Sequence, residues 1–196
     1  MKKAEVVNFF DNLAPQWDDD MIRNDEIIHT ILDNAKVSAE KEILDVACGT
    51  GVLIPDYLSR NVKSVTAIDI SPEMVKIAQK KFSQENVHII CGDAETEAFE
   101  QKFDCIVVYN AFPHFPEPEK LIKSLTAHLK PGGTLTIAHG MSREKIDRHH
   151  SGNASKVSIG LMSEEQLASM MEPELQVTVK ISDDRMYQVT GLYKNK

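Results

Sequence analysis

Long hydrophobic runs are missing from this sequence: no stretch approaches the ~20 apolar residues that a membrane-spanning helix needs. Two lysines near the start have no apolar stretch behind them, so we expect neither a signal peptide nor an anchor. Cysteine is scarce and lacks C-x-x-C spacing, which favours a reducing cytoplasm. All three cysteines fall in or beside predicted buried strands, where small core residues are expected: Cys48, Cys91 and Cys105.

Positive charge is also in short supply. The chain has 22 basic against 30 acidic residues and a net charge of −8. This balance disfavours tight, sequence-independent binding to nucleic acid, which requires several lysines or arginines to neutralise phosphates. At 196 residues the chain is long enough for one domain with a substantial core, and a second full domain is not expected.

The stretch from Glu42 to Gly51, E-I-L-D-V-A-C-G-T-G, joins a short apolar run to two glycines. The apolar residues fit a parallel strand that is buried on both faces. Gly49 and Gly51 would let the backbone turn tightly and approach a ligand. A helix is predicted over Val52 to Ser59, with its first N–H groups facing that ligand. The pattern indicates a strand, glycine loop, helix nucleotide site.

A second acidic position sharpens this prediction. Asp69 ends the next predicted strand, Ser64 to Ile68, and lies 20 positions after Gly49, where an open α/β fold places the carboxylate that accepts ribose hydroxyls. The third glycine of a dinucleotide site is missing, since Ile54 stands in its place. Asp45 lies just before the loop, where a carboxylate repels phosphates and suits a cation. A cationic ligand without phosphate is therefore favoured.

The Glu42–Gly51 stretch resembles motif I of the class I S-adenosylmethionine-dependent methyltransferases. The resemblance runs in order from Phe9 to Ala138, through Asp69, Gly92-Asp93-Ala94, Phe103-Asp104 and Leu129-Lys130-Pro131-Gly132-Gly133. The segment around Trp17 is similar to one that folds over the cofactor in small-molecule members, including quinone-biosynthesis methyltransferases. The resemblance implies S-adenosylmethionine as cofactor, bound by Trp17, Asp45, Ala47, Gly49, Gly51, Asp69, Ile70, Met74, Asp93, Ala94, Tyr109 and Asn110.

Alternating apolar patterns predict a doubly wound, mostly parallel α/β sheet. Further strands are expected over Val87–Cys91, Phe103–Tyr109, Thr134–Ala138, Leu175–Ile181 and Arg185–Tyr193. Helices are expected over Glu5–Leu13, Asn24–Ala35, Pro118–Leu129 and Ser163–Met171, and after a Ser71 cap. The alternation lapses over Gly140–Gly160. The resemblance implies seven strands in the order 3-2-1-4-5-7-6.

We expect a single methyltransferase domain over residues 1–196. Residues 1–40 would form an N-terminal helical lid, residues 41–139 the cofactor-binding core, and residues 140–196 a substrate-side segment with a terminal hairpin. A small-molecule acceptor is favoured, because the acidic charge disfavours nucleic acid and no extra domain is available to grip a polymer. A monomer or homodimer is expected, and no membrane insertion.

Histidines cluster in the segments that follow the fourth and fifth strands. We expect His114 and His139 to face each other in an acceptor pocket, with His150 approaching from the loop. Imidazole could deprotonate an acceptor as the methyl group arrives. Two other interpretations stay open, ordinary exposed-loop histidines and a divalent metal site. No H-x-x-x-H pair supports a metal, and none is predicted.

Two other function classes share these features. An NAD(P)-dependent oxidoreductase has the same fold and the same ribose carboxylate, although the third glycine is absent here. A non-catalytic S-adenosylmethionine-binding regulatory module would keep the fold without turnover. Titration with both cofactors would separate the first of these from a methyltransferase.

Overall fold

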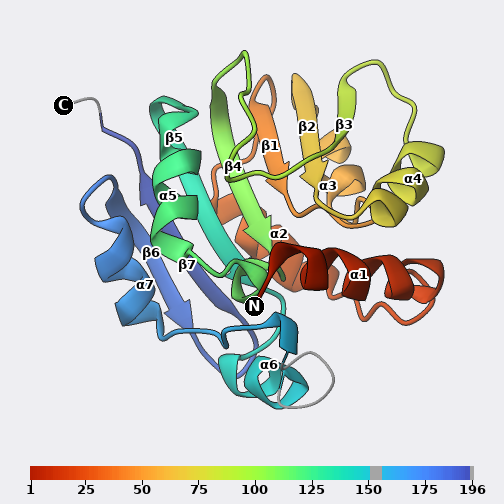
Figure 1. Cartoon of the computed structure of the whole chain (residues 1–196). Coiled ribbons are helices and arrows are strands. Elements are labelled where there is room, and N and C mark those ends of the chain that lie inside the picture. The colour runs from red at the N-terminus through yellow and green to blue at the C-terminus, as the bar shows by residue number, and fades with distance from the viewer. Residues whose placement is uncertain (151–155, 195–196) are drawn as a thin grey trace.

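The computed structural model describes residues 1–150 and 156–194, and the side chains of His149 and His150 lie outside the described part. Within it, seven strands form one sheet in the order β3-β2-β1-β4-β5-β7-β6 (Figure 1). The predicted strand order is thereby confirmed. The strands are β1 Glu42–Val46, β2 Ser64–Asp69, β3 Val87–Cys91, β4 Phe103–Tyr109, β5 Leu129–His139, β6 Gln176–Ser182 and β7 Tyr187–Leu192.

The neighbours among β1 to β5 are parallel, whereas β7 runs antiparallel to both β5 and β6. Parallel strands need covered faces, and the central strands β1 and β4 are almost wholly buried. The edge strand β3 is only partly covered, so Cys91 is exposed and the prediction that it is a core residue is wrong. Cys48 and Cys105 are buried as expected.

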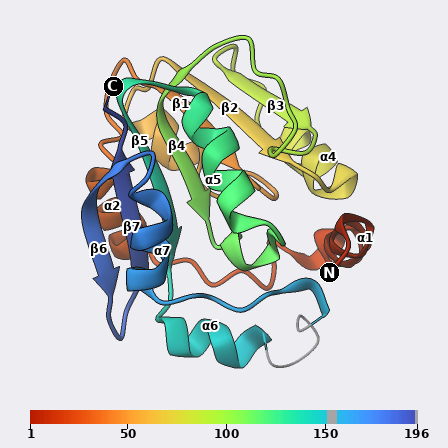
Figure 2. The same cartoon turned by 60° about the vertical axis from the view of Figure 1, so that its left-hand side comes forward.

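Helices cover both faces of the sheet (Figure 2). The core on one face includes residues of α5 and α7, and the core on the other includes residues of α2 and α3. The helices are α1 Lys3–Leu13, α2 Asp25–Asn34, α3 Ile54–Ser59, α4 Pro72–Lys81, α5 Pro118–Ala127, α6 Arg143–His150 and α7 Glu164–Met171. Short 3₁₀ helices occupy Ala14–Gln16 (η1) and Phe112–His114 (η2).

Polar side chains cap three helices, and the predicted cap Ser71 is confirmed. Asn24 and Ser71 each accept a hydrogen bond from a backbone N–H at the start of the following helix, at 3.2 Å. Ser163 and Gln166 form a capping box at the start of α7. These side chains satisfy donors that have no partner inside the helix, which fixes where each helix begins.

Several element boundaries differ from the prediction, and one helix was not predicted. Helix α3 begins at Ile54, not at Val52, because turns continue through the glycine loop. Helix α5 ends at Ala127, and Leu129 instead begins β5, where it pairs with Phe103. The 140–160 segment contains α6. This helix is polar, and its weak apolar pattern did not predict it.

The N-terminal residues lie across the carboxyl ends of the parallel strands. In Figure 1, α1 runs below the arrowheads of β1, β2 and β4. An open α/β sheet binds its ligands at this end, where the strand order reverses. The reversal falls between β1 and β4, so α1 and the segment after it cover the expected site.

Candidate functional site

A cavity opens at the carboxyl ends of the central strands and encloses about 1100 Å³, including its open mouth. Loops that follow β1, β2, β3 and β4 form its floor, and residues from α1 and the 14–23 segment form its cover. Most of the predicted cofactor residues line it: Trp17, Ala47, Gly49, Asp69, Ile70, Met74, Asp93, Ala94, Tyr109 and Asn110.

The two glycines of the loop have different roles. Both have positive φ, 56° at Gly49 and 86° at Gly51, which favours glycine. Gly49 lines the cavity, and a Cβ there would lie 3.8 Å from Nε1 of Trp17. Gly51 does not line the cavity, contrary to expectation. A Cβ there would lie 2.6 Å from Phe82 and 2.9 Å from Ile54, so its space is taken by packed side chains and not by a ligand.

Asp69 fastens the glycine loop to the end of β2. Its Oδ2 accepts the backbone N–H of Gly49 and its Oδ1 accepts that of Ser71, each at 2.8 Å. Burial raises the pKa of Asp69, although these backbone donors act in the opposite direction. Each carboxylate oxygen has a second lone pair, so the group can also accept hydroxyls from a ligand.

Asp45 lies under the loop and does not line the cavity. Its side chain is 2% exposed, and its Oδ2 has no hydrogen-bond partner among the described residues. Burial raises the pKa of Asp45 to about 8, and the charge of nearby Asp69 acts in the same direction. The prediction that Asp45 meets a cationic ligand directly is therefore not supported by its position.

Asp93 is part of an ion-pair cluster. Its Oδ2 lies 2.5 Å from Nζ of Lys3, which lies equally close to the fully buried carboxylate of Glu95. Burial alone would lower the pKa of Lys3, but the hydrogen bonds that Lys3 donates to the two carboxylates outweigh the effect of burial and raise this pKa. Lys3 lines the cavity and was missed from the sequence, because nothing local indicates that α1 crosses the loop after β3.

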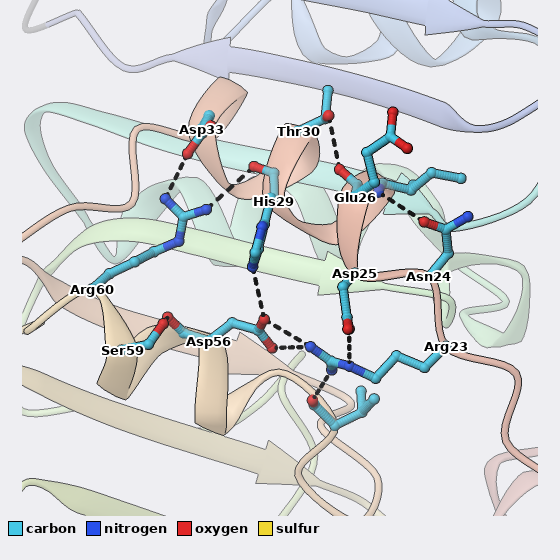
Figure 3. Close-up of polar contacts among 12 residues, drawn as sticks. Arg23, Asn24, Asp25, Glu26, His29, Thr30, Asp33, Asp56, Ser59 and Arg60 are labelled. Atoms are coloured by element: carbon cyan, nitrogen blue, oxygen red, sulfur yellow. Dashed lines mark hydrogen bonds and ion pairs between the residues drawn. The ribbon is translucent and has the colours of Figure 1, made fainter.

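Arg23 is a second cavity residue that sequence reasoning missed (Figure 3). Its Nη2 donates to both carboxylate oxygens of buried Asp56 at 2.7 Å, and its Nη1 donates to the carbonyl of Val52. Its Nε donates to Asp25 at 2.6 Å. A guanidinium has five N–H donors, so four are used in these bonds and one, on Nη1, is left for a ligand.

Aromatic rings continue the cover from the glycine loop to the end of β4. The rings of Trp17 and Phe10 meet edge to face at 5.7 Å between centroids, and Phe10 meets His114 in the same way at 4.9 Å. Nδ1 of His114 lies 2.6 Å from the carbonyl oxygen of Val157. A carbonyl only accepts, so Nδ1 carries the proton of this hydrogen bond.

The predicted histidine cluster is not formed as expected. His114 lines the cavity, but His139 does not; its side chain is 3% exposed and its ring meets Tyr187 edge to face. Neighbouring strand ends share an edge, yet alternation along the strand decides which way each side chain points. The side chain of His150 lies outside the described residues.

Within the described residues, no group of three or more His, Cys, Asp or Glu side chains could hold a metal ion. No helix in the same part of the chain is long and apolar enough to cross a bilayer.

The chain is similar to curated proteins that are named as O-methyltransferases. A malonyl-[acyl-carrier protein] O-methyltransferase of Priestia megaterium is 34% identical over 128 residues, which are 63% of this chain and 46% of that protein. A ubiquinone biosynthesis O-methyltransferase of Coxiella burnetii is 35% identical over 98 residues, 48% of this chain and 42% of that protein. The chain thus spans less than half the length of these curated relatives.

A solved structure and a family match agree with these relatives. The crystal structure of a SAM-dependent methyltransferase from Aquifex aeolicus has a TM-score of 0.68 and 21% identity, and the match covers 84% of this chain and 88% of that one, which shows the fold. Residues 43–133 match the methyltransferase domain family. The fold, the motif order and these relatives agree with that match, so residues 43–133 carry a methyltransferase domain similar to those of S-adenosylmethionine-dependent methyltransferases.

Proposed function

We propose that this chain binds S-adenosylmethionine in the cavity and methylates a small-molecule acceptor. The observation that carries the proposal is Asp69, a buried carboxylate that fastens the glycine loop, lines the cavity and still has lone pairs to accept further hydrogen bonds. The donor set fits this cofactor. Two carboxylates line the cavity for its hydroxyl and amino donors, aromatic faces suit its sulfonium, and the loop lacks the third glycine of a pyrophosphate site.

Individual residues are assigned to parts of the cofactor by their chemistry. Asp69 would accept the two ribose hydroxyls with its remaining lone pairs. Asp93 would accept the adenine amino group while Lys3 balances its charge. The remaining N–H of Arg23 would bind the cofactor carboxylate, because Arg23 and Lys3 are the only lysine or arginine side chains among the described residues that line the cavity.

When bound, the cofactor supplies an electrophilic methyl group on a good leaving group, so the chain needs to add little covalent chemistry. Its main contribution is to hold the acceptor atom in line and close to the methyl carbon, which converts a bimolecular encounter into a positioned one. The Val157 carbonyl keeps the His114 proton on Nδ1, which presents Nε2 as the basic nitrogen. His114 is thus the proposed general base, while His139 has no proposed catalytic part.

The acceptor is proposed to be small because the cavity is covered by the chain's own N-terminal residues. The two curated relatives are named for a malonyl-acyl-carrier acceptor and for ubiquinone biosynthesis, and neither acceptor is transferred to this chain. Reaction in the cytoplasm, by a monomer or a homodimer, is part of the proposal.

The test is a methyl-transfer screen with methyl-labelled cofactor over thiols, phenols, quinols and amines. We expect label to enter at least one acceptor and His114→Ala to lower that rate while cofactor affinity stays unchanged. Binding of the cofactor with no transfer to any class would instead support the regulatory module. Hydride transfer from NADH would support the oxidoreductase.

A further inference from the structure

The charged groups of the cavity are already paired. Four lining residues carry a formal charge: Lys3, Arg23, Asp69 and Asp93. Lys3 is held between two carboxylates, and Arg23 between Asp56 and Asp25. The remaining Nη1 donor of Arg23 is assigned to the cofactor carboxylate. An acceptor with its own negative charge would therefore find no unpaired cationic side chain among the described lining residues, so its desolvation would be costly.

Four apolar lining residues belong to segments other than those assigned to the ribose and the adenine. Met21 and Ile22 line it from the segment before α2, and Phe115 and Pro116 line it from the segment after η2. Ile22 is 86% exposed, which is unusual for a large aliphatic side chain at the edge of a cavity. These four residues are called the apolar mouth.

The apolar mouth continues beyond the cavity. Ile159 is 46% exposed, and its backbone N–H donates to the carbonyl of Pro113, which places it beside η2. Exposed aliphatic residues that lie singly need no explanation, but here Ile22 and Ile159 are two of only four large exposed hydrophobic residues in the described chain. The other two, Met1 and Leu13, are less exposed than either.

We infer that the acceptor is an uncharged molecule with an apolar body and a single reacting X–H group, bound with its body in the apolar mouth and its X–H group at His114. This inference rests on the proposed function. The rings of Trp17, Phe10 and His114, which meet edge to face, add aromatic surface that such a body can contact. The inference that the acceptor is uncharged excludes malonate-like and phosphorylated acceptors.

The balance of the reaction agrees with a neutral acceptor. A lone pair on X forms the new bond to the methyl carbon, and the electron pair of the broken carbon–sulfur bond remains on sulfur. The proton of X–H passes to Nε2 of His114, since Nδ1 already carries the proton donated to Val157. The products are a neutral methylated acceptor, a neutral thioether and a protonated imidazole, which returns its proton to water.

Matched probe pairs test the charge of the acceptor. Trp17 is the only tryptophan and lines the cavity, so its fluorescence reports binding there. With S-adenosylhomocysteine saturating, we would titrate 4-methylcatechol against 3,4-dihydroxybenzoate, 4-ethylphenol against 4-hydroxyphenylacetate, and octanol against octanoate. We expect at least one neutral member to bind and to do so roughly tenfold or more tightly than its anionic partner, since the carboxylate would be desolvated without a cation.

Variants of Ile22 sharpen the result. Because Ile22 is exposed, Ile22→Lys should leave the fold intact. The new lysine should pair with the carboxylate of each anionic probe and so reduce the preference for the neutral probe. Ile22→Gln adds no charge and should leave that preference unchanged. Anionic members that bind as tightly as neutral ones, or no binding by any neutral member, would overturn the inference while leaving the cofactor assignment standing. Failure of S-adenosylhomocysteine itself to bind would overturn the proposed function.

Discussion

The floor and the cover of the cavity are held in different ways. Backbone hydrogen bonds join the floor loops to the sheet, such as Cys48 N–H to the carbonyl of Ile68 and Gly92 N–H to that of Asp69. The N-terminal cover, residues 3–23, has no backbone-to-backbone bond to the rest of the described chain. It is attached by side chains alone, at three successive loops.

These attachments follow the strand order. Asp18 accepts from Thr50 in the loop after β1, and Asp11 accepts from Ser71 in the loop after β2. Lys3 meets the acidic pair after β3. Partly exposed side-chain contacts contribute less than buried backbone ones, so the cover can lift at a cost that leaves the floor unchanged. Changes in the floor should therefore affect the fold or the cofactor strongly, and changes in the cover more weakly.

The largest effect is expected at Gly51 in the floor. Gly51→Val adds side-chain atoms against Phe82 and Ile54 at a residue with φ of 86°, and we expect it to lower the free energy of unfolding by roughly 2 to 5 kcal/mol. Gly49→Ala is the matched control. It should cost less stability and weaken cofactor binding. Thermal unfolding and calorimetry would measure both, and a Gly51 variant of normal stability would contradict the packing role.

Asp69→Ala should have the next largest effect, on the cofactor. It removes the acceptor for the ribose hydroxyls, and we expect binding of S-adenosylhomocysteine to weaken by roughly 2 to 4 kcal/mol. Asp184→Ala, an exposed carboxylate in the terminal hairpin, is the control and should bind normally. An unchanged dissociation constant would show that Asp69 serves only to fasten the loop.

Arg23 joins the cover to the floor, and its substitution tests the assignment of the cofactor carboxylate. Arg23→Met should weaken S-adenosylhomocysteine by about 1.5 to 3 kcal/mol, the value of one charge-assisted bond. Methylthioadenosine lacks the amino-acid part, so its affinity should stay the same. Arg23→Lys keeps a cation beside Asp56 and controls for lost stability. Equal loss for both ligands would point to a collapsed site.

Asp45 makes a pH-dependent contribution to the free energy of unfolding. Its pKa in the fold, about 8, lies above its usual value of 3.8, so the folded state holds a proton that the unfolded chain releases. The stability it contributes is complete below pH 3.8 and is lost as the pH rises towards 8. Asp45→Asn should remove this slope, at most ~1.4 kcal/mol per pH unit, in unfolding measured from pH 5 to 8. If the free energy of unfolding had the same pH dependence in the wild type and in Asp45→Asn, this prediction would be refuted.

The smallest effect concerns the cover itself. We expect cofactor binding to order the segment around Trp17, because only side-chain contacts hold it in place. The change would appear as a shift in tryptophan fluorescence and slower proteolysis of the N-terminal segment. Signals that do not respond to saturating cofactor would mean that the cover is closed throughout.

The floor could be predicted from the residues themselves, whereas in the cover only Trp17 was predicted, through the family resemblance. Gly49, Asp69 and Asp93 are close to strand ends, and a strand's position in a parallel sheet follows from its apolar run and the order of crossovers. Lys3 and Arg23 belong to the cover, whose place depends on pairs such as Lys3 with Glu95, 92 positions apart. No local pattern encodes such a pair.

The errors have the same origin. Gly51 and His139 were placed in the site by position along the chain, but the direction of a single Cα–Cβ vector decided both. At Gly51 that direction meets Phe82, and at His139 it leads away from the cavity towards Tyr187. Sequence spacing predicts which loop a residue occupies, and packing determines what the residue faces.

Calorimetric titration of the purified chain with S-adenosylhomocysteine and with NADH tests the central claim most directly. The account predicts micromolar binding of S-adenosylhomocysteine, weakened in the Asp69→Ala variant, and much weaker binding of NADH, because the loop after β1 has no pyrophosphate cradle. NADH bound more tightly than S-adenosylhomocysteine would contradict it.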